Sequence, residues 1–339
     1  MLLVPGAAEA RRWEAAAAAV LRRAWGLRAS PVAATTGWNH TWRADGFWLT
    51  CRPAAEGAAF RRETELFGRL NDRAPVSGVR APVAVPTSSG GLCAQARGHV
   101  WRLTQELPGE TPSGFHQADY PRAGEGLARL HGFLAGLGPR TAVQTRGPVD
   151  IAAAQVARGV PRPADLRDLA DVADLAAADR ARLALGLRAV ADGLAGVRAA
   201  PRQLLHGDPG LPNLRVDPAS RELVAVLDLE AASVGPVEHD LGCIGLSAFS
   251  HREDDGIDGV AALASAVAAY RRGTGRTVDE RAVYVLMLAN EIRLLRELLR
   301  GTRPGKNLHS VVQWQFGRYR KVFDAWSRLR FQGERACLT

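Results

Sequence analysis

Cysteine is scarce in this chain of 339 residues, and its four cysteines lie far apart. Cys51, Cys93, Cys243 and Cys337 form no Cys-x-x-Cys pair. This spacing favours neither a structural zinc site nor a disulfide framework. We therefore expect a protein of a reducing compartment, the cytoplasm.

Lysine is almost missing, since only Lys306 and Lys321 occur and arginine supplies nearly all of the positive charge. The formal net charge is +9, and a basic balance can indicate polyanionic partners. The arginines are spread along the chain, however, without the clustered face of a nucleic-acid reader. Together with abundant Ala and Gly, this bias is typical of GC-rich coding, and we predict no nucleic-acid partner.

Long apolar runs are also lacking. The apolar stretch from Ala15 to Leu21 is bracketed by Arg11, Arg12, Arg22 and Arg23. It is far too short to cross a bilayer and does not resemble an export signal. We expect a surface helix here and no membrane partner.

Several motifs of other enzyme classes are absent from the sequence. There is no GxxxxGK[ST] loop, no GxGxxG after a strand, no HExxH and no GxSxG. Hydrolase and dehydrogenase functions therefore have no support.

The patterns that are present predict two lobes, because 339 residues are too many for one small core. Asp45-Gly46 predicts a hairpin turn, residues 60–70 are spaced as a helix, and strands are expected at 47–52, 83–85 and 100–103. Glu106–Gly109 breaks the pattern and could link the lobes. We expect an α+β protein with a small β-rich lobe at 1–106 and a larger, mainly helical lobe at 107–339.

Within the helical part, leucines recur at spacings of three and four residues. Residues 139–165 are richer in Pro, Gly and Arg and are expected to be a loop or an insertion. Near the end, an apolar stripe predicts one face of a long helix; its members are Val312, Phe316, Tyr319, Phe323 and Trp326.

The segment 204–242 carries the candidate chemistry. Asp208 is followed five residues later by Asn213, and Asp228 ends a second apolar run after the turn at 218–221. The two apolar runs predict a short β-hairpin, which could bring the three polar side chains to one edge. The alternative is a polar turn beside a hairpin, in which Asp208 merely caps the turn.

Phosphoryl transfer needs these residue types. A carboxylate orients the attacking hydroxyl and can accept its proton, while an amide oxygen and a second carboxylate hold Mg²⁺ against the phosphates. Kinase catalytic loops have an Asp followed five residues later by an Asn, with a metal-binding Asp downstream.

His206-Gly207-Asp208 with Asn213, then Asp228-Leu229-Glu230 and Glu238–Leu241, resemble the signature of the aminoglycoside phosphotransferase and choline kinase family. The match extends upstream; its further segments are Thr36–Thr41, Arg62-Glu63, Gln105–Gly109 and Leu127–His131. It covers most of residues 32–245, whereas 246–339 match no motif of the family. The resemblance implies a bilobal, protein-kinase-like fold and an enzyme that phosphorylates an alcohol group, with ATP or GTP as donor and Mg²⁺ as cofactor.

The resemblance also implies roles for single residues. Asp208 is expected to be the catalytic aspartate, with Asn213 and Asp228 as ligands of Mg²⁺. Asp240 is expected to brace the catalytic loop and His206 to support it structurally. His131 is expected to be a packed core residue.

On the nucleotide side, Glu63 is expected to pair with a basic residue of the preceding strand that contacts the α- and β-phosphates. The family usually has lysine there, but the best-matching position is Thr50. Arg52 projects from the same strand face, and a guanidinium can bind phosphate in a bidentate way. We predict that Arg52 takes this role; the alternative is a surface arginine beside Pro53.

The remaining nucleotide contacts follow from the same resemblance. Backbone groups near Glu106 and Leu107 are expected to meet the base. Asn39 and Thr41 could hydrogen-bond phosphate, although Asn and Thr are also common in turns.

The acceptor is less constrained. Residues 281–339 contain few acids against many arginines, which argues against a strongly cationic acceptor. We expect a neutral or weakly charged hydroxyl compound, such as a nucleoside-type or sugar-containing antibiotic, phosphorylated for resistance or self-resistance. Trp314, which is out of phase with the apolar stripe, Glu230 and Glu291 are candidate acceptor contacts; Glu230 could instead touch metal-bound water or cap a turn.

Two alternatives stay open at this point. The first is a metabolic kinase for homoserine, choline or a sugar, and the second is a catalytically inactive nucleotide-binding protein of the same fold. The sequence leaves the choice of purine and the oligomeric state undecided.

Overall fold

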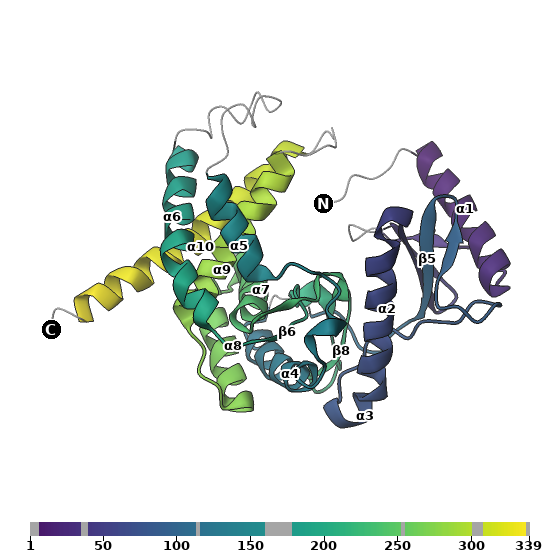
Figure 1. Cartoon of the computed structure of the whole chain (residues 1–339), viewed down its shortest axis with the longest axis horizontal. Coiled ribbons are helices and arrows are strands. Elements are labelled where there is room, and N and C mark those ends of the chain that lie inside the picture. The colour runs from purple at the N-terminus through teal and green to yellow at the C-terminus, as the bar shows by residue number, and fades with distance from the viewer. Residues whose placement is uncertain are drawn as a thin grey trace. The chain divides into compact units, whose positions relative to one another are not determined.

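The computed structural model describes residues 7–34, 40–112, 116–159, 178–251, 255–299 and 308–336 (Figure 1). The chain forms two compact units. The first comprises Met1–Glu110, Thr141–Gln144 and Arg215–Ala232, and the second comprises Thr111–Arg140, Thr145–Leu214 and Ser233–Thr339. The sequence suggested one boundary, between 106 and 107, whereas the first unit also takes in two later segments.

An antiparallel sheet forms the centre of the first unit. Its strand order is β1-β2-β3-β5-β4, with β1 at Val32–Ala33, β2 at His40–Ala44, β3 at Phe47–Pro53, β5 at His99–Gln105 and β4 at Ala94–Ala96. Asp45 and Gly46 both have positive φ, 47° and 80°, which matches the twist that a two-residue hairpin turn requires. The predicted hairpin is confirmed, since Ala44 pairs with Phe47 across this turn.

The two faces of this sheet are covered by different helices, and Figure 1 shows α1 and α2 on either side of β5. Alternating residues of β3 and β5 pack against α1 (Ala7–Trp25); they are Leu49, Cys51, Trp101 and Leu103. The intervening residues Arg52 and Arg102 face α2 (Gly57–Asp72), where both guanidinium groups lie against the ring of Phe60. A period of two thus gives the sheet one apolar face and one face with buried arginines.

The strand predicted at 83–85 pairs with β5 only briefly, since Val85 N–H donates to the Leu103 carbonyl at 2.8 Å and Gln105 N–H to that of Val83 at 2.9 Å. Only Ala84 forms a bridge, to Thr104, and the edge strand that pairs regularly with β5 is Ala94–Ala96. Pro82 and Pro86 flank the predicted segment. Because proline lacks the N–H group that a ladder needs, pairing cannot extend in either direction.

The later segments of the first unit include a β-hairpin, as predicted. β7 (Leu214–Val216) and β8 (Leu223–Val226) form a two-stranded sheet. Glu110 and Val216 exchange backbone hydrogen bonds of 2.9 and 2.8 Å, and the Arg221 side chain forms an ion pair with Glu110. The hairpin is therefore tied to the end of the first long segment. The short helix α3 (Ala74–Ser77) and the 3₁₀ turns at Ala54–Glu56 and Leu229–Ala231 also belong to this unit.

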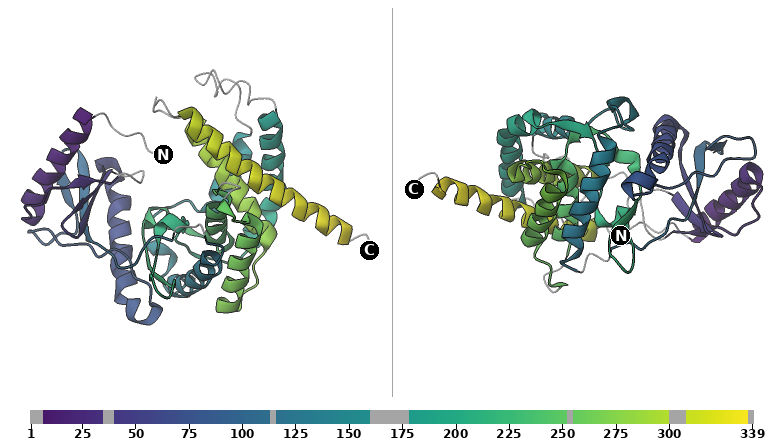
Figure 2. Two further views of the ribbon diagram at one scale, coloured as in Figure 1. Left: turned by 180° about the vertical axis from the view of Figure 1, so that it is seen from behind. Right: turned by 90° about the horizontal axis from the view of Figure 1, so that it is seen from below.

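The second unit is mainly helical. Its helices are α4 (Asp119–Leu134), α5 (Pro148–Arg158), α6 (Ala178–Ala199), α7 (Glu238–Phe249), α8 (Gly259–Thr274), α9 (Glu280–Leu299) and α10 (Leu308–Ala336). Strands β6 (Arg202–Leu204) and β9 (Val234–Pro236) pair antiparallel, and 3₁₀ turns occur at Pro139–Thr141 and Leu211–Asn213. Figure 2 shows α10 as the long yellow helix that ends at the C-terminus.

Two expectations for this unit have different outcomes. The apolar stripe of the last helix is confirmed, because Val312, Phe316, Tyr319 and Trp326 of α10 are buried. Of the loop or insertion expected at 139–165, the described part, which ends at 159, contains helix α5 and is therefore not a plain loop. Proline is favourable at the first helical position, and the Asp150 carboxylate accepts a hydrogen bond from the Gly147 N–H at 3.0 Å, so the Pro- and Gly-rich segment starts a helix.

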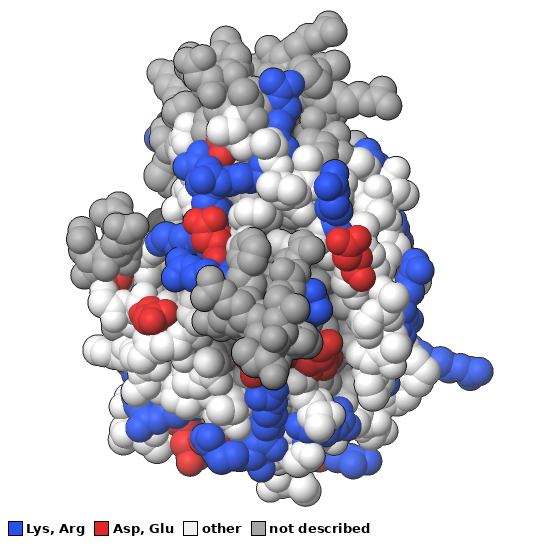
Figure 3. All heavy atoms as spheres, turned by 90° about the vertical axis from the view of Figure 1, so that its left-hand side faces the viewer, with Lys and Arg blue, Asp and Glu red and all other residues white. Residues whose placement is uncertain are grey.

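Two further features concern membrane spans and surface charge among the described residues. None of the described helices is long and apolar enough to cross a membrane. Figure 3 views one face, on which Asp and Glu side chains lie among the Lys and Arg side chains.

Candidate active site

The segment that contains Asp208 is fixed to helix α7 by one carboxylate. Asp240, in the first turn of α7, accepts hydrogen bonds from the backbone N–H of His206 at 2.9 Å and of Gly207 at 3.0 Å. Gly207 has φ of 89°, a conformation that glycine adopts without steric cost. The turn before Asp208 is therefore held by two charge-assisted hydrogen bonds, as the sequence predicted for Asp240.

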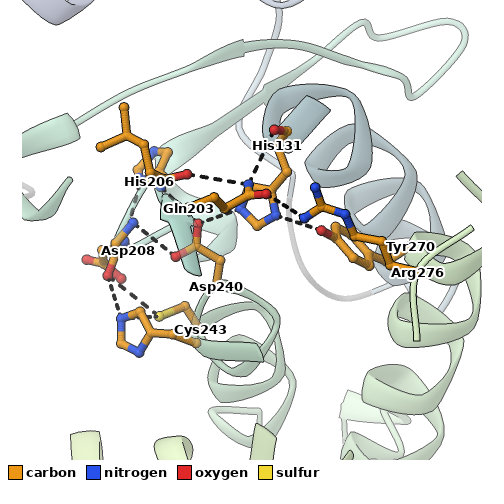
Figure 4. Close-up of polar contacts among 11 residues, drawn as sticks. His131, Gln203, His206, Asp208, Asp240, Cys243, Tyr270 and Arg276 are labelled. Atoms are coloured by element: carbon orange, nitrogen blue, oxygen red, sulfur yellow. Dashed lines mark hydrogen bonds and ion pairs between the residues drawn. The ribbon is translucent and has the colours of Figure 1, made fainter. Parts of the chain in front are cut away.

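Asp240 is itself part of a buried polar network (Figure 4). Its Oδ2 atom lies 2.9 Å from Nε2 of His131 on α4, and Nδ1 of His131 lies 3.0 Å from the hydroxyl of Tyr270 on α8. Burial would raise the pKa of Asp240, but the hydrogen bond from His131 and the nearby imidazoles outweigh it and lower that pKa. Asp240 thus stays an anion inside the unit, and His131 is confirmed as a packed residue.

Asp208 and Asn213 lie together, as the five-residue spacing predicted. Nδ2 of Asn213 is 2.9 Å from the Asp208 carbonyl oxygen and 3.4 Å from its Oδ2. Since Nδ2 donates toward Asp208, the Oδ1 atom of Asn213 is on the opposite side of the amide. Asp208 is exposed, and its backbone N–H lies 3.3 Å from Nδ1 of buried His206. The pair thus presents a carboxylate and an amide oxygen at the surface of the second unit.

Helix α7 holds the loop at a second point. The Ser247 hydroxyl accepts a hydrogen bond from the Leu211 N–H at 3.1 Å. His239 Nε2 lies 3.0 Å from the Gly207 carbonyl oxygen. Ser247 was not among the predicted residues, because its role depends on helix α7 packing against this loop.

In the first unit, the acidic pair Asp228 and Glu230 follows strand β8. Asp228 has φ of 54°, a left-handed conformation that Asp tolerates better than most residues. Both carboxylates face Arg52, whose Nη2 lies 2.6 Å from Glu230 Oε2 and 3.8 Å from Asp228 Oδ1. The turn therefore directs two acids towards the same buried cation.

Arg52 also forms the predicted ion pair with Glu63. Its Nη2 lies 3.2 Å from Glu63 Oε2, and both side chains are buried, at 4% and 1% exposure. Arg52 is therefore not the surface residue that was its alternative. Arg102, which the sequence analysis missed, lies at the same distance from the same carboxylate oxygen; an arginine in phase with Val100 and Thr104 in a buried strand was the available signal.

The candidate metal ligands have the right chemistry for Mg²⁺. Carboxylate oxygens and an amide oxygen are hard donors of the kind that this ion prefers. Among the described residues, no three His, Cys, Asp or Glu side chains form a preformed metal cluster. The roles of Asn213 and Asp228 as Mg²⁺ ligands stay a prediction.

The other predicted nucleotide contacts have the following positions. Thr41 Oγ1 lies 3.4 Å from Thr50 Oγ1, on paired strands. Glu106 donates its N–H to the Gly46 carbonyl and its carboxylate pairs with Arg43 at 2.9 Å, while Leu107 is buried. Asn39 lies outside the described residues. Contact of any of these residues with a nucleotide stays a prediction.

The candidate acceptor residues of the second unit differ in exposure. Glu291 is fully buried, and its carboxylate lies 2.8 Å from Arg318 Nη2 and 2.6 Å from Gln315 Nε2. Burial raises the pKa of Glu291, although Arg318 opposes this change. Trp314 is 49% exposed, and the Arg318 guanidinium lies 4.6 Å from its ring centroid. Trp314 is therefore the more accessible of these two residues.

Comparisons with known proteins identify the family and the fold. A model of the phosphotransferase enzyme family matches residues 4–284. No curated protein matches the chain.

Several solved structures share the fold. The amicoumacin kinase hAmiN, in complex with AMP-PNP, Ca²⁺ and Ami, has a TM-score of 0.65 at 10% identity, over 94% of this chain and 96% of that one. A thermostable mutant of the phosphotransferase APH(4)-Ia, in complex with ADP and hygromycin B, has a TM-score of 0.60 at 14% identity, over 91% of this chain and 98% of that one. The aminoglycoside phosphotransferase APH(3'')-Id from Streptomyces rimosus, in complex with ADP and streptomycin, has a TM-score of 0.54 at 18% identity, over 79% of this chain and 94% of that one. With a family match over most of its length, the chain belongs to the phosphotransferase enzyme family, and it has the α+β fold of the aminoglycoside phosphotransferases.

Proposed function

We propose that this chain is a kinase that transfers the γ-phosphoryl group of ATP or GTP to a hydroxyl group of an antibiotic-like small molecule. The observation that carries the proposal is the contact between Asn213 and Asp208, in which Nδ2 of Asn213 donates to the Asp208 carbonyl oxygen and towards its carboxylate within one loop. Family membership supports the reaction class. The structural relatives that bind ADP, GDP or AMP-PNP support a nucleotide donor.

Asp208 acts as the catalytic residue in this proposal. Its exposed carboxylate orients the acceptor hydroxyl and can take its proton as the new oxygen–phosphorus bond forms and the bond to the β-phosphate oxygen breaks. ADP or GDP is the leaving group, and the transfer is direct and in line. Mg²⁺, when bound, supplies charge stabilisation to the phosphates.

The remaining residues position the two substrates. Arg52 contacts the phosphates, and its ion pair with Glu63 fixes the guanidinium. The backbone near Glu106 and Leu107 meets the base, and Thr41 with Asn39 contacts phosphate. Asp240 and His206 hold the loop of Asp208.

The acceptor is proposed to be neutral or weakly charged. Trp314 offers an exposed ring on which a nucleoside-type or sugar-containing antibiotic can stack, and Glu230 is a second candidate contact. Glu291 is neutralised by Arg318, so it gives no free negative charge to a polycationic drug. The antibiotic complexes among the structural relatives support a role in resistance or self-resistance.

Two other functions compete with this one. A metabolic kinase for homoserine, choline or a sugar would use the same chemistry with another acceptor. An inactive nucleotide-binding protein is favoured by Thr50 at the usual lysine position, but Arg52 supplies a cation two residues away, against Glu63.

A panel of hydroxyl compounds tests the proposal, with mass spectrometry of the product and a parallel measurement of nucleotide consumption. Asp208→Asn is expected to lower turnover roughly 10²–10⁴-fold while nucleotide binding persists. Asp192→Asn, the same change at an exposed position of α6, is the control and is expected to behave as wild type. Full activity of the Asp208→Asn protein would refute the assignment, and phosphorylation of only metabolic acceptors would favour the first alternative.

A further inference from the structure

Two arginines share one buried carboxylate in the first unit. Nη2 of Arg52 and Nη1 of Arg102 both lie 3.2 Å from Oε2 of Glu63. All three side chains are at most 5% exposed. Buried charges are costly unless they are paired, so the other partners of each arginine decide how Glu63 is shared.

The sheet register explains how the second arginine reaches this carboxylate. Arg102 of β5 is directly opposite Thr50 of β3, and Arg52 is opposite Val100. Opposite residues of an antiparallel pair share a face and lie close together. Arg102 therefore enters from the neighbouring strand beside the Thr50 position, while Arg52 enters two residues further along β3.

The two guanidinium groups have different further contacts. Arg102 Nη1 donates to Thr64 Oγ1 at 3.0 Å, and its guanidinium lies 4.2 Å from the Phe60 ring centroid and 4.5 Å from that of Phe67. These contacts with Glu63 and its neighbours are all on helix α2. Arg102 is thus anchored to the helix that carries Glu63.

Arg52, in contrast, divides its charge between Glu63 and the acids after β8. Its Nη2 atom is only 2.6 Å from Glu230 and 3.8 Å from Asp228, which are about 40% and 36% exposed. Of these two acids, Asp228 is the one proposed to bind the metal ion of the nucleotide. Arg52 can therefore exchange partners while Arg102 keeps its own.

We propose that Arg102 is a positioning residue, which holds and neutralises Glu63 when Arg52 turns to the phosphates of the nucleotide. This inference rests on the proposed function. Without Arg102, each movement of Arg52 towards phosphate leaves Glu63 as a buried anion with no cation beside it, and that cost reduces affinity for phosphates. The role that a single lysine often fills is here divided between two arginines on adjacent strands.

Calorimetric titration of the full chain with Mg-ADP, Mg-GDP, adenosine and guanosine tests this division. Arg102→Gln is expected to weaken the diphosphate complex at least about tenfold and the nucleoside complex less than about twofold. Arg102→Lys, which keeps the charge without the planar fork, is expected to be intermediate. Arg69→Gln, on the exposed side of α2, is the matched control and is expected to bind both ligands as wild type does.

The outcomes separate the two proposals. Diphosphate binding by Arg102→Gln at the wild-type affinity, or equal weakening of nucleoside and diphosphate, would overturn the positioning role. If Arg102→Gln does not fold, the Arg102→Lys protein provides the test. A diphosphate affinity of Arg102→Lys equal to that of the wild type would then count against the positioning role. A wild-type chain that binds neither nucleotide would overturn the proposed function and this assignment with it.

Discussion

Nε2 of His131 lies 2.9 Å from Oδ2 of Asp240, and this contact joins helix α4 to helix α7 beneath the loop of Asp208. The same carboxylate accepts two backbone N–H groups of that loop. The anion of Asp240 therefore contributes to stability and to loop geometry at once.

Asp240→Asn is expected to destabilise the chain by about 3–5 kcal/mol at pH 7, since an amide would replace a buried anion that three donors surround. The folded-state pKa of Asp240 is lowered, so its contribution is present above the unfolded-state pKa of about 3.9 and is lost as pH falls through the lower, folded-state value. Urea unfolding of the wild type and of Asp240→Asn measures the difference in their free energies of unfolding from pH 7 to pH 4, and this difference is expected to persist over most of that range. A difference that has already vanished at pH 5.5 would contradict the argument.

The close approach of α4 to α8 gives a prediction with an internal control. A Cβ atom at Gly124 would lie 2.2 Å from the Ala266 carbonyl oxygen, whereas one at Gly132, also in α4, would meet no atom within 4 Å. Gly124→Ala is expected to cost about 1–3 kcal/mol or more because backbone must move. Gly132→Ala is expected to stabilise by about 0.5–1 kcal/mol through helix propensity. Thermal unfolding compares the two, and equal effects would refute the packing argument.

Asn213 has two separable roles in the proposed reaction. Asn213→Ala removes both the amide oxygen and the donor to Asp208, so the Mg²⁺ concentration for half-maximal turnover is expected to rise and turnover to fall. Asn213→Asp keeps an oxygen ligand but places a second carboxylate where Nδ2 lies 3.4 Å from Asp208 Oδ2. Metal affinity is then expected to persist, while turnover falls because the like charges repel. Magnesium titrations of turnover distinguish these outcomes; wild-type behaviour of both variants would exclude Asn213 from the site.

The buried and the partly exposed cysteines of the described residues are expected to differ in reactivity. Burial raises the pKa of Cys51 to about 12. Burial, with the Asp208 and Asp240 carboxylates nearby, raises the pKa of Cys243 well above its usual range. Because the thiolate is the reactive form, both are expected to resist iodoacetamide at pH 8 in the native chain and to react in urea, while partly exposed Cys93 reacts sooner. Peptide mapping measures this, and rapid native labelling of Cys243 would contradict its burial.

The sequence predicted contacts where local spacing determines them. Asp208 and Asn213 share one loop, and Arg52 and Glu63 are joined by a short strand-to-helix connection, so both pairs were expected. Arg102 is 39 residues beyond Glu63, and only the β3–β5 register brings it to that carboxylate. The ends of elements near β4 and α5 were also missed. In a turn-rich stretch, a proline can end a strand, start a helix or lie in a loop, and the local sequence does not distinguish these cases.

The division of the chain into units has a consequence for biosynthesis. The first unit is built from three separate stretches, and its last one is Arg215–Ala232. A ribosome that has delivered only the first 110 residues has therefore not supplied the hairpin to which Glu110 is bonded. Although N-terminal domains commonly fold first during synthesis, this one must wait for about two thirds of the polypeptide, and a fragment cut after Glu110 would lack the acids that Arg52 binds.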